Sequence, residues 1–365
     1  MNDRFRASNC KPGATLVRHG RLADENMTNV TGINGSGASS VRISVSWKFW
    51  LFMLAACFGA AGCSRPEQPT AIEHRQDPSP SQASPDGKTF TLVGAGDIAS
   101  CQNIEGARAT AKLIERIPGT VFAAGDLAYE GGSPDEFEFC YGPTWGEFKA
   151  RTRPTLGNHE YVNPTAHGYF EYWGAQAGPV GKGYYSYDLG SWHIVALNTN
   201  CTVKGLGGCA TGSPEEEWLR QDLAGHPDAC ILAYSHQALF SSGLLKTHAI
   251  HPELKEFWQD LYAAHAALFL VGHEHSYERF APQDPEGHSE PERGIREIVV
   301  GTGGRSHDPL GFAIPNSEVR NASTYGVLKL TLTPGHYAWQ FIPVEGESFT
   351  DSGSGECPNQ NRPKS

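Results

Sequence analysis

The sequence predicts an α/β (α+β) layered sandwich, in which central mixed β-sheets are flanked by helices. From Thr89 onward, apolar runs of strand length alternate with loops and with a few helical patterns. Such alternation of strands and helices is typical of sheets layered with helices. The last two predicted strands follow one another with no helix between them, which indicates an antiparallel hairpin at one end of the fold.

The individual elements follow from the apolar pattern and from helix-start signals. One helix begins with Ser213 as a cap, Pro214 at the first helical position and Glu216 at the third, which is the usual composition of a helix start. We expect three helices, at Ile104–Ile117, Pro214–Leu223 and Pro252–Ala266. We expect strands at Phe90–Ala95, Thr120–Ala124, Trp192–Asn198, Ala229–Tyr234, Ala267–Val271, Glu297–Val300, Tyr325–Leu332 and His336–Ile342. The predicted catalytic domain is residues 88–350, followed by a C-terminal tail at 351–365.

Composition and charge exclude one class of partner. The 365 residues are 39% hydrophobic and 19% charged, which is ordinary for a globular protein. The formal net charge is −11, and no basic block or Lys/Arg-aromatic pattern occurs. Nucleic acid is therefore not an expected partner, because neutralising its phosphates requires a positive face. A metal cluster could still bind a small phosphate ester, since bound cations dominate the field around them.

The N-terminal region reads as an export signal. An apolar run at Phe49–Cys63 follows the basic residues Arg42 and Lys48 and ends in small residues, which is typical of a secretory signal peptide. Its end at Cys63 resembles a bacterial lipoprotein signal, in which the cysteine is lipidated and becomes the new N-terminus. Cys57 fits the same pattern with a shorter apolar run, and an ordinary signal peptide without lipid is the other alternative.

The segments around the signal are not expected to fold. Residues 1–63 form the predicted extension and signal, and a translation start near Val41 or Val45 would explain the polar stretch before it. Residues 64–87 are rich in Pro, Ser and Gln and poor in apolar side chains, so we expect a tether. The sequence thus predicts an exported protein, either a periplasmic, outer-membrane or cell-surface lipoprotein or a secreted one, whose membrane contact would be the lipid at Cys63.

Export to an oxidising compartment would allow the cysteines to form disulfides. Of nine in the chain, six follow the signal, and an even number in an oxidising compartment suggests three disulfides. Cys201–Cys209 is the simplest pair, because it closes a glycine-rich loop. Cys101–Cys140 and Cys230–Cys357 would be the other two pairs, but six cysteines allow fifteen pairings, so the sequence indicates only Cys201–Cys209.

Five segments carry candidate ligand residues: four follow predicted strands, and the one at Gly157 follows the short segment Pro154-Thr155-Leu156. In layered α/β folds, sites form outside the carboxyl ends of strands, so these segments should converge. Each has an ordinary alternative by itself: a Gly-Asp pair is usually a turn, and a lone histidine is usually hydrogen-bonded in the core. Together, a buried set of this kind would carry uncompensated charge unless cations neutralise it. The segments are Gly96-Asp97, Gly125-Asp126-Leu127-Ala128-Tyr129, Gly157-Asn158-His159-Glu160, Ser235-His236 and Gly272-His273-Glu274-His275.

This ordered set resembles the calcineurin-like metallophosphoesterase superfamily, and more narrowly its purple acid phosphatases, over roughly residues 90–345. The continuation Ser276-Tyr277-Glu278-Arg279 is similar to the purple acid phosphatase pattern. Many metallophosphodiesterases have a histidine at the position of Ala99. Here Tyr129 replaces that ligand, and a phenolate is a hard, anionic donor that stabilises iron(III). The alternative for Tyr129 is a core tyrosine.

The resemblance implies a role for each residue. Asp97, Tyr129 and His275 would hold Fe³⁺, and Asp126 would bridge both metals. Asn158, His236 and His273 would complete a site for a divalent ion, which could be Zn²⁺, Mn²⁺ or Fe²⁺. His159 would bind the phosphate or protonate the leaving alkoxide, while a metal-activated water attacks phosphorus.

Some features depart from the resemblance or stay outside it. The family usually has a proline soon after the fourth-motif histidine, whereas His236 is followed by Gln237-Ala238-Leu239. Plant-type members carry a β-sandwich before the catalytic domain, and this chain has the tether there. His248 and His251 are expected at the surface or at a helix entry, with substrate contact as the alternative. Gly301-Thr302-Gly303-Gly304 is weak evidence for a role in the site.

The sequence leaves three candidate functions open. The first is a phosphate monoesterase that scavenges phosphate outside the cytoplasm, and the resemblance through Tyr129 favours it. The second is a phosphodiesterase acting on nucleotides or lipid head groups with the same dimetal core. The third is a binding or adhesion domain without catalysis, which the intact set of ligand-type residues argues against.

Overall fold

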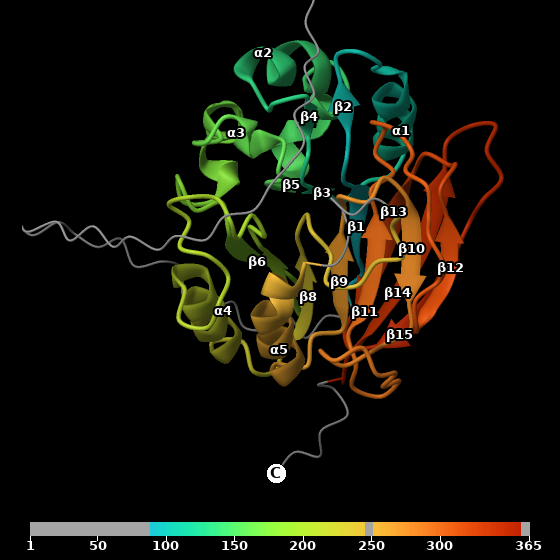
Figure 1. Cartoon of the computed structure of the whole chain (residues 1–365). Coiled ribbons are helices and arrows are strands. Elements are labelled where there is room, and N and C mark those ends of the chain that lie inside the picture. The colour runs from blue at the N-terminus through green and yellow to red at the C-terminus, as the bar shows by residue number, and fades with distance from the viewer. Residues whose placement is uncertain (1–87, 245–250, 359–365) are drawn as a thin grey trace, which may run out of the picture. The chain divides into compact units, whose positions relative to one another are not determined.

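The computed structural model describes residues 88–244 and 251–358 of the chain. These residues form two mixed β-sheets with helices packed on them (Figure 1), so the predicted fold class is confirmed. The predicted signal peptide, the tether, Cys63 and His248 lie outside the described residues. Within the described ranges, no helix combines the length and the apolar character that crossing a membrane requires.

The first sheet has six strands in the order β15-β14-β13-β1-β3-β5. Strands β1, β3 and β5 are parallel, whereas β13, β14 and β15 continue the sheet as antiparallel neighbours. The predicted hairpin is β13–β14, which pairs through Thr333 and His336 at its turn. The bounds are β1 Phe90–Ala95, β3 Thr120–Ala124, β5 Thr152–Thr155, β13 Gly326–Thr333, β14 His336–Pro343 and β15 Ser352–Glu356.

The second sheet has seven strands in the order β12-β10-β11-β9-β8-β7-β6. Its centre is parallel (β11, β9, β8, β7), and antiparallel strands complete both edges. The bounds are β6 Tyr185–Leu189, β7 Trp192–Ala196, β8 Cys230–Tyr234, β9 Leu268–Val271, β10 Tyr277–Phe280, β11 Arg296–Val300 and β12 Ser317–Asn321. Two short strands, β2 Ala99–Ser100 and β4 Ala128–Tyr129, pair in parallel beyond the first sheet.

The three predicted helices are present, the first with shorter bounds, the second one residue longer, and the third with a 3₁₀ first turn. They are α1 Glu105–Glu115, α4 Pro214–Ala224 and α5 Lys255–Ala263, the last preceded by a 3₁₀ turn at Pro252–Leu254. Ser213 caps α4 through its side chain, as its sequence predicts. The remaining helical segments lie between β4 and β6, and they are α2 Pro134–Glu136, a π-turn at Phe137–Tyr141, 3₁₀ turns at Trp145–Arg151, Glu160–Val162 and Gly174–Ala177, and α3 His167–Trp173.

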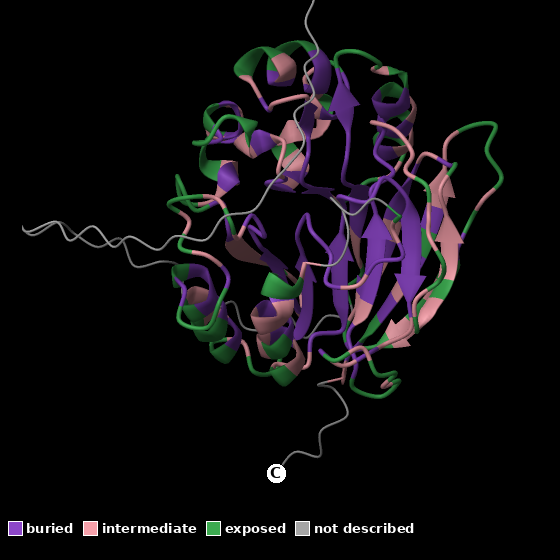
Figure 2. Cartoon of the chain, in the orientation of Figure 1, coloured by how far each residue is buried: buried purple, intermediate pink, exposed green. Residues whose placement is uncertain are grey.

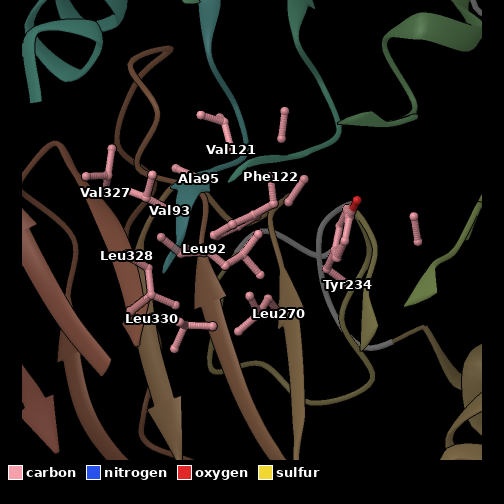
Figure 3. Close-up of a cluster of buried hydrophobic side chains, with 14 of the residues drawn as sticks. Leu92, Val93, Ala95, Val121, Phe122, Tyr234, Leu270, Val327, Leu328 and Leu330 are labelled. Atoms are coloured by element: carbon pink, nitrogen blue, oxygen red, sulfur yellow. The ribbon is translucent and has the colours of Figure 1, made fainter. Parts of the chain in front are cut away.

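The core has two layers because the central strands are buried on both faces (Figure 2). Strand β8 shows the division: Leu232 and Tyr234 face the other sheet, while Ile231 and Ala233 face the helices. The layer between the sheets includes Leu92, Phe122, Tyr234, Leu270 and Leu328 (Figure 3). Helices α4 and α5 pack side by side on the outer face of the second sheet (Figure 1).

The predicted C-terminal boundary differs from the structure. Residues 352–356 form the edge strand β15, which pairs with β14. Cys357 is disulfide-bonded to Cys230, which ties this end of the chain to β8. The sequence Ser-Gly-Ser-Gly-Glu has no apolar side chain, so its pattern does not indicate a strand. The folded region therefore continues past residue 350.

The predicted disulfide Cys201–Cys209 is present, and the other four cysteines of the folded region form two more bonds. The three bonds are Cys101–Cys140, Cys201–Cys209 and Cys230–Cys357. The first joins the segment after β2 to the π-turn, and the second closes the loop before α4. Disulfides persist in oxidising compartments, so these pairs are compatible with an extracellular protein.

Candidate metal centre

Four of the candidate ligands stand at equivalent places in the fold, each two residues after the end of a parallel strand. They are Asp97 after β1, Asp126 after β3, His236 after β8 and His273 after β9. Strands β1 and β3 belong to the first sheet, and β8 and β9 belong to the second. The candidate centre therefore lies where the carboxyl ends of both sheets meet, as the sequence predicts.

Backbone strain marks three of these four positions. Asp97, Asp126 and His273 have φ values of 60°, 51° and 70°, in the left-handed region that non-glycine residues rarely adopt. Such conformations persist where the surrounding structure holds them, and they concentrate at functional sites.

One group of side chains surrounds the hydroxyl of Tyr129. This oxygen lies 2.8 Å from Oδ1 of Asp97, 3.0 Å from Oδ2 of Asp126 and 3.1 Å from Nε2 of His275. His275 Nε2 is also 3.3 Å from Oδ1 of Asp97. The three residues predicted to hold Fe³⁺ thus lie in contact with one another.

A second group surrounds the ring of His236. Its Nε2 lies 3.2 Å from Oδ2 of Asp126, 3.1 Å from Oδ1 of Asn158 and 3.1 Å from Nδ1 of His273. Its Nδ1 is 2.9 Å from the carbonyl oxygen of Ala124, which leaves Nε2 to face the other ligands. Asp126 Oδ2 contacts both groups, so its position suits the predicted bridging ligand.

Glu160 holds the turn that carries Asp126. It is fully buried, and its carboxylate accepts the backbone N–H groups of Gly157 (2.7 Å), Asp126 (3.0 Å) and Leu127 (2.8 Å). Gly157 must lack a side chain, since a Cβ there would lie 2.0 Å from Oδ1 of Asp126. Burial and, to a smaller extent, the charge of Asp126 raise the pKa of Glu160 to about 7. The hydrogen bonds from these N–H groups act in the opposite direction and lower it.

His159 lies beside the centre without joining either group. Its Nδ1 is 2.7 Å from the carbonyl oxygen of Glu130, so this nitrogen donates and the ring orientation is fixed. Its Nε2 is 3.9 Å from Oδ2 of Asp126, and its ring lies 4.4 Å from that of Tyr129. The structure therefore places His159 as predicted, next to the candidate ligands and with 28% of its side chain exposed.

The loop after β11 supports the Tyr129 side of the centre. The side-chain oxygen of Ser306 is 2.6 Å from Nδ1 of His275, and an Asp308 carboxylate oxygen is 3.8 Å from the same nitrogen. Partners on the distal nitrogen commonly orient a histidine ligand. The glycine-rich sequence before this loop gave only weak evidence of a role, yet the structure places it against Asp97: a Cβ on Gly301 would lie 2.7 Å from Oδ2 of that residue.

The electrostatics of the site are those of a cation-binding cluster. Burial would raise the pKa of Asp126, but the imidazoles of His236, His159 and His273 outweigh it and hold the pKa well below its usual range. Burial lowers the pKa of His236, but its neighbours, chiefly the carboxylate of Asp126, outweigh burial and raise that pKa to about 9. Burial and the charges of Asp126 and Asp97 raise the pKa of Tyr129 well above its ordinary value. A phenolate at Tyr129 therefore needs a neighbouring cation.

The donor set fits metal ions. Ligand atoms of Asp126, His236 and His273 lie within 4.8 Å of one another, and all three residues are buried. Asp97 and Tyr129 add hard oxygen donors on the other side of Asp126. Carboxylate and phenol oxygens suit a trivalent ion, and imidazole with carboxylate suits a divalent one. The described residues thus provide two adjoining ligand groups of different character.

A cavity of about 360 Å³ adjoins the His236 side of the centre. Its lining includes Asn158 and His273 together with His251, Gln237 and Glu253. His251 Nδ1 lies 3.1 Å from Glu253, and its ring is 5.2 Å from that of His273. His251 precedes the 3₁₀ turn before α5, so it is a helix-entry residue that also lines the cavity. Gln237 stands at the wall, where it is hydrogen-bonded within the structure.

Comparison with known families supports the assignment of the fold. The profile of the family described as calcineurin-like phosphoesterase matches residues 90–277, which is more than half of the chain. That range contains all the candidate ligands. The comparison with curated protein sequences finds no match.

Solved structures share the fold at low sequence identity. A purple acid phosphatase from yellow lupin (Lupinus luteus) seeds has a TM-score of 0.58 and 18% identity over 73% of this chain and 54% of its own. The chain thus spans about half the length of that enzyme. GAP50, the anchor in the inner membrane complex of Plasmodium, has a TM-score of 0.55, with 14% identity over 72% of this chain and 88% of its own. PhoD has a TM-score of 0.52, with 13% identity over 74% of this chain and 70% of its own.

Proposed function

The chain belongs to the calcineurin-like phosphoesterase family, and within that family we propose that it hydrolyses phosphate monoesters at a centre of two metal ions. The convergence of two ligand groups on Asp126, one of which contains Tyr129, carries this proposal. The proposed centre belongs to the purple acid phosphatase type, with Fe³⁺ held by Asp97, Tyr129 and His275. The divalent ion, Zn²⁺, Mn²⁺ or Fe²⁺, would be held by Asn158, His236 and His273, with Asp126 shared.

The bound ions would supply a nucleophilic water and neutralise phosphate charge. The side chains of this protein supply the remaining functions. Asp126, fixed by Glu160, orients both ligand groups. His159 keeps Nδ1 on the carbonyl of Glu130, so its Nε2 is the atom that faces substrate and can hold a proton for the leaving alkoxide. The cavity lined by His251 and Gln237 would receive the alcohol part of the ester.

A phosphodiesterase acting on nucleotides or lipid head groups is the second candidate, because the same ligand set supports either reaction. The monoester proposal rests on Tyr129 in place of the histidine that many phosphodiesterases have at the position of Ala99. A non-catalytic role is the third, since one protein of this fold is described as an anchor. The complete ligand set and the positioned His159 favour catalysis over that role.

The proposed setting is outside the cytoplasm, where the enzyme would release phosphate from small esters. Three disulfides among the described residues are compatible with this location. The lipid anchor at Cys63 remains part of the proposal, to be checked by mass spectrometry of the mature N-terminus. An unmodified N-terminus at another residue would remove the anchor and leave secretion.

Steady-state kinetics with p-nitrophenyl phosphate and bis-p-nitrophenyl phosphate test the reaction. We expect a higher kcat/KM for the monoester, and loss of both activities after removal of metals with a chelator. A large preference for the bis ester would assign the diesterase reaction instead. Absence of hydrolysis from protein that contains both metals would favour the non-catalytic role.

A further inference from the structure

Arg305 lies at the edge of the candidate centre and has no part in the proposed chemistry so far. Its backbone N–H donates to the carbonyl oxygen of Asp97 at 3.0 Å. The preceding Gly304 has φ +143°, and a Cβ there would lie 2.2 Å from the backbone nitrogen of Ala107. The chain is therefore tightly held immediately before Arg305, so the origin of this side chain is fixed relative to Asp97.

The guanidinium of Arg305 lies against the same tyrosine whose hydroxyl contacts the candidate ligands. Its Cζ is 5.0 Å from the centre of the Tyr129 ring. One of its terminal nitrogens donates to Oε1 of Glu130 at 2.6 Å, and the side chain is 23% exposed. Glu130 also holds His159 through its carbonyl oxygen. His159, Glu130 and Arg305 thus adjoin Tyr129 together, beside the candidate ligands.

The donors of Arg305 are only partly used. Its Nε is buried and finds no hydrogen-bond acceptor among the described residues. The guanidinium presents five N–H donors in a planar fork that matches phosphate oxygens. A buried donor without an acceptor is costly, so the protein alone leaves this guanidinium incompletely satisfied. This observation points to an anionic ligand.

Substrate charge and shape decide which phosphate this arginine favours. A monoester carries nearly two negative charges near neutral pH, because its second pKa is about 6. A diester carries one charge and has an alkyl or aryl group on one of the oxygens. The attraction of a cation grows in proportion to the charge it meets. We propose that Arg305 is a specificity-determining residue that selects monoesters over diesters by binding the phosphoryl oxygen that a diester esterifies. This inference rests on the hydrolysis proposed above.

The test compares wild type with Arg305→Gln and Arg305→Lys on p-nitrophenyl phosphate and its bis ester. We expect Arg305→Gln to lower kcat/KM about 10- to 100-fold for the monoester and less than about threefold for the diester. Arg305→Lys keeps the charge and loses the fork, so its monoester kcat/KM should fall between the two. Arg153→Gln is the matched control, because Arg153 lies 5.6 Å from the ring of Tyr187 in the second sheet.

Metal content and thermal unfolding of each variant show whether the centre and the fold are intact. An equal fall of both activities in an intact Arg305→Gln protein, or no change in either, would overturn the proposal. Failure of wild type to hydrolyse either ester would contradict the proposed function itself. Binding of inorganic phosphate to metal-loaded protein would then decide the role of Arg305: about tenfold weaker binding in Arg305→Gln supports it, and unchanged affinity rejects it.

Discussion

Two clusters of aspartate and histidine among the described residues differ in how their charges are satisfied. At the candidate metal centre, Asp97, Asp126 and Tyr129 meet three imidazoles between the ends of both sheets. The second cluster lies near the amino end of β7, where His193 is held by Asp188 on β6 and Asp222 on α4. Residue types alone therefore do not distinguish a site from a structural contact.

In the second cluster, a protonated His193 ring satisfies both neighbouring carboxylates, and no metal ion is needed. Nδ1 of His193 lies 2.9 Å from Asp188 and Nε2 lies 2.8 Å from Asp222, so both ring nitrogens have an acceptor. His226 stacks on this ring, with centroids 3.6 Å apart and planes 15° apart. Parallel rings cannot direct their in-plane lone pairs at one ion, which argues against a metal there. The metal centre differs because carboxylate oxygens and the Tyr129 hydroxyl face one another.

The largest effect should come from Asp126→Asn, which removes the carboxylate shared by both ligand groups. We expect kcat/KM to fall about 10³-fold or more, because the bridging charge that orients both halves is lost. Steady-state kinetics and metal analysis of the purified variant measure this. Full activity with unchanged metal content would place the chemistry elsewhere.

Glu160→Gln should have a smaller effect on the same centre. Its two carboxylate oxygens accept three close backbone N–H groups, and an amide offers one oxygen and a mismatched NH₂ group. Mutation of a residue that orients metal ligands typically lowers metal affinity about 10- to 100-fold, and we expect a loss of that size for Glu160→Gln. Competition with a chelator measures affinity directly. If the affinity stays at the wild-type value, Glu160 is not a positioning residue.

The second cluster should affect stability and leave catalysis unchanged. Burial opposes the charged form of His193, but Asp222 and Asp188 outweigh it and raise its pKa. A raised folded-state pKa gives stability that is present below the unfolded value of about 6.5 and is lost as pH rises through the folded value. His193→Gln should therefore cost about 1–3 kcal/mol at pH 5 and less at pH 9.

Chemical unfolding at both pH values, beside kcat/KM, checks the His193 prediction. The relevant charged neighbours are Asp188 on β6, Asp222 on α4 and the stacked His226 after α4. A stability difference that does not change with pH would mean that packing, not charge, explains the effect. A large loss of activity would show that the two clusters are not independent.

The parts of the fold that could be predicted are those whose residues carry an apolar pattern. Strands β1 and β3 have the predicted bounds, since their apolar runs match their burial. Strand β10 reads as polar, Tyr-Glu-Arg-Phe, yet it is fully buried. Its Glu278 accepts from Ser242, and its Arg279 pairs with Asp351, so distant partners make burial of these charges possible. A local pattern does not contain such partners.

The same division applies to the site. The candidate ligands could be predicted because they follow strand ends in a known order, and strand ends converge. Arg305, Ser306 and the carboxylate of Glu130 could not, because their positions depend on loop contacts that no spacing encodes. His251 was expected at a surface or helix entry, and its place beside His273 depends on the packing of the segment before α5.

The visible spectrum, recorded beside a metal analysis, tests the central claim most directly. It compares the purified protein from an oxidising host with its Tyr129→Phe variant, in which the hydroxyl that contacts Asp97, Asp126 and His275 is absent. We predict two metal ions per chain, iron among them, and a charge-transfer band that disappears in Tyr129→Phe. A band that persists in the variant, or a wild-type protein without iron and without colour, would contradict the Fe³⁺–Tyr129 assignment.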